Sequence, residues 1–138
     1  MQKFSREYQQ KLVSVEYAAS LVNSHDWIDY GNLSGQTVAF DQALARRVHE
    51  LRDVKISTIL PQYTPRVMEV DPEGESFIWN SWHFSKWDRK AAQQQRPVYY
   101  APIRYSELPR YIRENVEPID ISVRQVAPMD EHGFFNFG

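Results

Sequence analysis

A strand, a glycine-containing loop, an amphipathic helix and a second strand follow one another between residues 26 and 60, and this order constrains the fold most strongly. One strand is predicted at 26–30, a short segment flanked by polar residues, and a second at 54–60, where β-branched residues are frequent. The apolar residues between them recur with a helical period: Phe40, Ala43, Leu44, Val48 and Leu51. This unit predicts a right-handed crossover between two parallel strands.

The rest of the chain continues the alternation. The pattern predicts helices at 5–12, 15–23, 85–95 and 105–115, and strands at 67–70, 77–79, 98–101, 119–126 and from 134 onward. Hydroxyl side chains lie at or near the starts of the helices and are the expected N-caps: Ser14, Thr37, Ser85 and Ser106. The predicted fold class is therefore α/β, with a mainly parallel sheet flanked by helices.

Length and composition narrow the class of protein. The chain has 138 residues, the size of one domain, and no cysteine, which excludes disulfides and thiol catalysis. No apolar run is long enough to span a membrane, and the polar N-terminus lacks the apolar region of a signal peptide. We expect a cytoplasmic protein that does not associate with membranes.

Charge and histidine spacing exclude two further classes. The formal net charge is −2 and no basic stripe is present, so nucleic acid is not an expected partner. His25, His49 and His132 are widely separated and give no metal-ligand spacing, so no metal is expected. Aromatic residues make up 14% of the chain, which predicts either a ring-rich core or a surface for a partner.

Three segments, taken in order, resemble the acetyl-CoA hydrolase/transferase family. They are Trp-Ile-Asp-Tyr-Gly at 27–31, Trp-Asn-Ser-Trp-His-Phe-Ser at 79–85 with Asp-Arg-Lys at 88–90, and the long stretch 100–138. The third contains Tyr-Ala-Pro-Ile-Arg-Tyr-Ser-Glu-Leu-Pro-Arg-Tyr, Gln-Val-Ala-Pro-Met-Asp and Gly-Phe-Phe-Asn-Phe-Gly. The resemblance covers essentially the whole chain and is greatest to the butyryl-CoA:acetate and 4-hydroxybutyrate CoA-transferases.

The resemblance implies an activity that this chain would share with a second half. Family members have two similar α/β halves, and residues 1–138 resemble the N-terminal one. They move CoA from an acyl-CoA to a short carboxylate through a glutamyl-CoA thioester, so CoA is a substrate and no cofactor is needed. The nucleophilic glutamate belongs to the C-terminal half, the expected partner, and the full-length protein is expected to be a homo-oligomer. This chain alone is expected to be inactive, and its apolar end at 134–138 reads as an interruption.

Candidate binding residues follow the predicted strands, because ligands of parallel α/β sheets bind outside the carboxyl ends of strands. The resemblance assigns them to substrate binding: Ser34, Gly35, Gln36, His83, Ser85, Gln125 and Met129. The alternative interpretations are that the loop at 31–36 is an ordinary turn and that His83 is a buried histidine hydrogen-bonded to the backbone. Glu107, Glu114 and Glu117 are interpreted as structural, and no residue of this chain is expected to be catalytic.

Two other functions remain open from the sequence. A binding or interaction domain of the same fold would need no second half and would expose no large apolar patch. A sugar-phosphate isomerase-like relative would need an acid and base pair, which the sequence does not identify.

Overall fold

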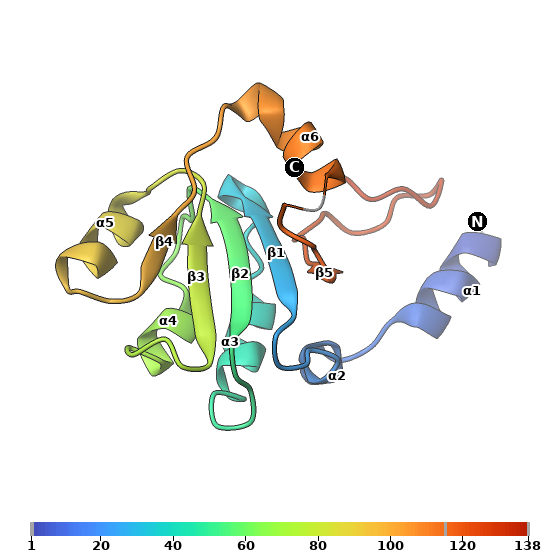
Figure 1. Cartoon of the computed structure of the whole chain (residues 1–138). Coiled ribbons are helices and arrows are strands. Elements are labelled where there is room, and N and C mark those ends of the chain that lie inside the picture. Colours follow the sequence, from blue (N-terminus) through green and yellow to red (C-terminus); the bar gives the residue numbers. More distant parts are fainter. Residues whose placement is uncertain (1, 115, 138) are drawn as a thin grey trace.

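The computed structural model describes residues 2–114 and 116–137, and it contains a five-stranded parallel sheet of order β4-β3-β2-β1-β5 (Figure 1). The strands are β1 (Trp27–Asn32), β2 (Val54–Ile59), β3 (Phe77–Ser81), β4 (Val98–Tyr100) and β5 (Ile121–Ser122). The predicted α/β class and parallel sheet are confirmed.

Among the described residues, the helices α1 (Gln2–Lys11) and α2 (Val15–Ser20) precede β1, and four helices and two short 3₁₀ turns connect the strands. The connecting elements are η1 (Leu33–Gly35), α3 (Val38–Ala45), α4 (Arg66–Val70), α5 (Lys86–Gln93), η2 (Tyr105–Glu107) and α6 (Leu108–Arg113). From β1 to β4, each strand lies next to the one that precedes it in the chain. Because such crossovers are right-handed and all run in one direction, their helices are expected on the same face of the sheet. None of the described helices is long and apolar enough to cross a bilayer.

The hydrophobic core lies between the sheet and the crossover helices. Ile28, Ile56 and Trp79 are register neighbours on β1, β2 and β3 and are almost fully buried. The ring of Tyr30 meets those of Phe40 and Trp79 edge to face, each with its centroid 6.1 Å away. Edge-to-face packing is favourable for aromatic rings, and it places some of the chain's many aromatic residues in the core.

The opposite face of the sheet is polar near its carboxyl end. Asp29, Ser57 and Asn80 are register neighbours there and are all buried. The chain from β4 to β5 passes over the carboxyl end of the sheet (Figure 1) and covers this row. Both faces of a parallel sheet are normally covered by other parts of the chain. On this face, the covering segment makes polar contacts with the sheet.

Two of the predicted caps are confirmed. Ser14 accepts a hydrogen bond from the backbone of Tyr17 at the start of α2. Ser85 accepts from the backbone of Trp87 and Asp88, and the Asp88 carboxylate accepts from the backbone of Ser85, which completes a capping box on α5.

Two other predicted caps are wrong. Thr37 makes no capping hydrogen bond to α3, and its buried hydroxyl has no partner in the described structure. Ser106 does not cap α6, because the helix begins after the turn η2, with Glu107 at the N-cap position.

Several predicted boundaries also differ. The predicted strand 67–70 is the helix α4, because the Asp41 carboxylate accepts the backbone N–H groups of Arg66 and Val67 and so caps it. The helix α3 ends at Ala45, so Val48 and Leu51, which continued the helical period, lie beyond it. The strand predicted at 119–126 shortens to β5, and 134–137 is irregular. Asn115, the predicted end of one helix, and Gly138 lie outside the described residues.

Candidate functional site at the carboxyl edge of the sheet

The loops that follow β1 and β2 are joined by one side chain. The Gln36 carbonyl oxygen accepts from the backbone N–H groups of Gln62 and Tyr63, each at 2.9 Å, and its amide nitrogen donates to the Tyr63 carbonyl at 3.2 Å. Gln36 is buried, so its amide is used to hold these loops together. Leu33 and Leu60 directly follow the two strands and have positive φ angles, which non-glycine residues rarely adopt.

The segment after β5 returns to the same edge. The backbone N–H of Gln125 donates to the Gly35 carbonyl at 3.1 Å. Ser34, next to Gly35, is exposed. The structure therefore brings together four of the predicted residues from segments about 90 positions apart: Ser34, Gly35, Gln36 and Gln125.

A hollow of about 520 Å³ lies between the loops that follow β2 and β3. Its lining is Leu60, Pro61, Gln62, His83, Phe84, Ser85, Lys86, Trp87 and Arg89. His83 is exposed and also lines a second hollow of about 140 Å³. That smaller hollow is otherwise lined by Ile59, Trp82, Ile103, Tyr105 and Leu108. The predicted residues His83 and Ser85 thus share one hollow, although the Ser85 hydroxyl already caps α5.

The buried carboxylate of Glu117 fixes the polar face beneath this edge, and no sequence pattern pointed to its surroundings. Its Oε2 accepts from the Ser57 hydroxyl at 2.6 Å. Its Oε1 accepts from the Asn80 amide, the Trp82 indole N–H at 3.0 Å and the Tyr111 hydroxyl at 3.3 Å. Burial and the neighbouring Glu117 charge raise the pKa of Tyr111. Because Trp82 precedes His83, this network holds the loop that carries the histidine.

A second polar contact fastens β5 to β1. The Arg124 guanidinium pairs with the Asp29 carboxylate and also donates to the Asp29 carbonyl at 2.8 Å. Gly31 lies beneath it with φ +76°, and a Cβ there would come within 2.9 Å of the Arg124 side chain. Neither Asp29 nor Arg124 was singled out from the sequence, because no local pattern pairs residues so far apart.

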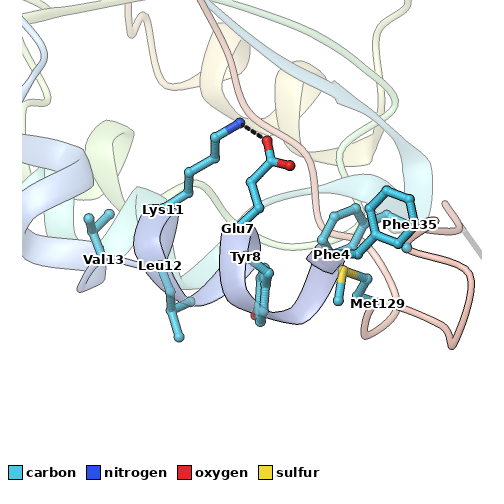
Figure 2. Close-up of a pocket in the computed structure, with 9 residues that line it drawn as sticks. Phe4, Glu7, Tyr8, Lys11, Leu12, Val13, Met129 and Phe135 are labelled. Carbon is cyan, nitrogen blue, oxygen red and sulfur yellow. Dashed lines mark hydrogen bonds and ion pairs between the residues drawn. The ribbon is translucent and has the colours of Figure 1, made fainter. Parts of the chain in front are cut away.

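Met129 lies in a different place from the other predicted residues. It lines a groove of about 490 Å³ between α1 and the C-terminal segment, with Phe4, Tyr8 and Phe135 among its neighbours (Figure 2). The segment folds back on itself, since the backbone N–H of Ala127 donates to the Asn136 carbonyl. Met129 is therefore not among the residues that line the two carboxyl-edge hollows.

Acidic and histidine side chains are dispersed over the part of the chain that the structure describes, where no group of three or more is placed to hold a metal ion. The three predicted structural glutamates differ in their surroundings. Glu107 and Glu114 pair with Arg110 on the surface of α6, whereas Glu117 is buried.

Comparison with known proteins gives consistent matches. A family model described as the acetyl-CoA hydrolase/transferase N-terminal domain matches residues 1–138. The butyryl-CoA:acetate CoA-transferase of Anaerostipes caccae is 44% identical over 98% of this chain. A "Probable butyrate:acetyl-CoA coenzyme A-transferase" of Syntrophomonas wolfei is 42% identical over 99% of it. In both cases the chain spans 30% of the relative's length.

Solved structures share the fold. RipA from Yersinia pestis matches with a TM-score of 0.85 and 22% identity, over 99% of this chain and 33% of the other. The 4-hydroxybutyrate CoA-transferase of Porphyromonas gingivalis matches with a TM-score of 0.62 and 20% identity, over 99% and 30%.

Proposed function

This chain belongs to the acetyl-CoA hydrolase/transferase family, and from that premise we propose that it is the N-terminal part of an acyl-CoA:carboxylate CoA-transferase. The observation that carries the proposal is 44% identity to a butyryl-CoA:acetate CoA-transferase along nearly the whole chain. The proposed substrates are a short-chain acyl-CoA, such as butyryl-CoA or 4-hydroxybutyryl-CoA, and acetate.

The proposed reaction needs a nucleophile from outside this chain. A glutamate carboxylate attacks the thioester carbonyl and expels the CoA thiolate, which leaves an acyl-glutamyl anhydride. The thiolate then attacks the glutamyl carbonyl, releases the carboxylate and forms a glutamyl-CoA thioester. Acetate reverses the sequence and leaves as acetyl-CoA. We propose that a C-terminal part corresponding to the remaining length of the relatives supplies the glutamate, and that the full-length protein is a homo-oligomer.

The carboxyl edge is proposed to hold the substrates. His83 stands between the two hollows and can donate a hydrogen bond to a carboxylate or thioester oxygen. The smaller hollow is lined mainly by apolar side chains, and its volume of about 140 Å³ suits a short acyl chain. The loops at 34–36 and 125 form the adjoining wall, held in place by Gln36 and by the Gln125–Gly35 contact.

A chimera tests this proposal. The chain replaces the matching N-terminal 30% of the Anaerostipes caccae relative, and acetyl-CoA formed from butyryl-CoA and acetate is measured. We expect acetyl-CoA from the chimera and none from the 138-residue chain alone. A chimera that folds and assembles like the parent enzyme but forms no acetyl-CoA would contradict the proposal and favour a binding domain.

The chimera also tests the role of His83. His83→Gln removes the imidazole ring but keeps a polar side chain, so we expect the KM for acetate to rise or kcat to fall about tenfold or more. His132→Gln is the matched control, because His132 is also exposed but lies in the turn near the α1 groove. Equal effects of the two substitutions would remove His83 from the proposed site.

A further inference from the structure

The lining of the larger carboxyl-edge hollow contains positively charged side chains. Lys86 and Arg89 lie three residues apart on α5, so they share a face of the helix, and both line the hollow beside His83. No acidic side chain of the described residues lines it. The local charge is therefore positive although the chain as a whole is slightly negative.

The one carboxylate on this part of α5 points away from the hollow. Asp88 is buried, and it accepts hydrogen bonds from the Trp79 indole N–H at 2.8 Å and from the backbone of Ser85. Its charge is thus used within the fold, where it holds α5 against the core face of the sheet. It does not compete for the neighbouring cations.

Lys86 and Arg89 both have N–H groups that can donate hydrogen bonds to a ligand. The side chain of Lys86 is exposed and makes no hydrogen bond or ion pair with another described residue. Arg89 donates through Nη1 to the Phe84 carbonyl at 2.9 Å, which steadies the guanidinium against the loop after β3. That bond uses one of its five N–H groups, and a guanidinium held in this way can still bind an anion through the others.

We propose that this hollow binds the phosphate-bearing adenosine end of coenzyme A, an inference that rests on the proposed CoA-transferase function. Arg and Lys are the side chains that recognise phosphate groups. The volume of about 520 Å³ lies within the range of nucleotide and other small-molecule sites. The half-buried indole of Trp87 adds an aromatic surface for an adenine ring.

Calorimetric titration with adenosine 3′,5′-bisphosphate tests the inference on the 138-residue chain. Lys86→Gln and Arg89→Gln are each expected to weaken binding about tenfold, because each removes a charged donor to phosphate. Arg89→Lys keeps the charge and is expected to retain part of the affinity. All these side chains are exposed, and a thermal unfolding midpoint near that of the unsubstituted chain shows that each variant is folded.

Lys11→Gln is the matched control. Lys11 is an exposed lysine on α1 that pairs with Glu7 at 2.8 Å and lines the separate groove beside the C-terminal segment. We expect this variant to bind the nucleotide within about twofold of the unsubstituted chain. Equal weakening by Lys11→Gln, or no binding to the unsubstituted chain, overturns the inference. Inorganic phosphate that competes as strongly as the bisphosphate also overturns it, because the adenosine would then contribute nothing.

The chimera separates this inference from the proposed function. If the chimera transfers CoA but Lys86→Gln and Arg89→Gln leave the KM for butyryl-CoA unchanged, only the nucleotide site is wrong. If the chimera is inactive while the titration shows the expected pattern, the transferase proposal fails and the nucleotide site stands.

Discussion

Glu117 shows at the scale of a residue how the polar face of this sheet is held. Four neutral donors surround its carboxylate, from Ser57, Asn80, Trp82 and Tyr111. A buried carboxylate is tolerated only when its lone pairs are satisfied in this way. The same bonds fix Trp82 next to His83, so the stability of the fold and the geometry of the candidate site depend on one side chain.

Substitution of Glu117 tests that network. Glu117→Ala leaves several buried donors without an acceptor, and we expect the free energy of unfolding to fall by about 3 kcal/mol or more. Glu117→Gln keeps an acceptor for the donors that converge on Oε1, so its cost is expected to be about 1 kcal/mol. Urea denaturation measures both. If the alanine variant were as stable as the glutamine variant, the network would not contribute as described.

Two glycines give a matched pair at the end of β1. Gly31→Ala is expected to destabilise by about 1–2 kcal/mol, because φ is +76° and the new Cβ would press on Arg124. Gly35→Ala is the control, because a Cβ added there would meet no side chain or backbone within 4 Å beyond its chain neighbours, and its φ is not positive. Urea denaturation should show little or no loss for that variant. A Gly31→Ala protein as stable as the control would contradict the account of the Asp29–Arg124 contact.

At the scale of elements, α3 and α4 are coupled through a buried acid. Asp41 on α3 accepts from the backbone of Arg66 and Val67 at the start of α4 and from the Tyr30 hydroxyl. Burial raises the pKa of Asp41 to about 6 from its ordinary 3.8, although the backbone hydrogen bonds oppose the shift. The start of α4 is thus capped by the carboxylate of Asp41, which belongs to α3.

This coupling predicts a pH dependence. Between about pH 3.8 and 6 the folded chain keeps a proton on Asp41 that the unfolded chain loses, so this group favours folding less as pH rises. Asp41→Asn removes the titration. We expect the variant to gain stability relative to the unsubstituted chain by up to ~3 kcal/mol between about pH 4 and pH 7. Denaturation at several pH values measures this difference, and a difference that stays constant would contradict the raised pKa.

The sequence predicted the elements whose signals are local. The strands β1 to β4 and the cap Ser85 follow from alternation and from a serine placed before a helix. The strand predicted at 67–70 became α4 because Asp41, some 25 residues earlier, caps it. Gln36 and Glu117 likewise owe their environments to partners that only the fold brings close. Polar contacts between residues far apart in the chain could not be predicted, because local sequence patterns do not show which distant residues the fold brings together.

At the scale of the whole molecule, one apolar surface lies away from the carboxyl edge. The groove between α1 and the C-terminal segment contains Tyr8 and Phe135, whose ring centroids are 5.8 Å apart. Phe134 and Phe137 are each 70% exposed. The aromatic content therefore serves both a core, around Trp79 and Tyr30, and an exposed surface. Within the family, the chain covers about 30% of the curated relatives, and the proposed activity belongs to that longer assembly.

The most direct test of the central claim is to locate butyryl-CoA on the chain by amide NMR chemical-shift mapping. The account predicts that the largest shifts fall in the loops at 33–36, 60–63 and 82–89, which form the carboxyl edge. Shifts confined to the groove at 4–13 and 129–135, or no shifts at saturating butyryl-CoA, would contradict it.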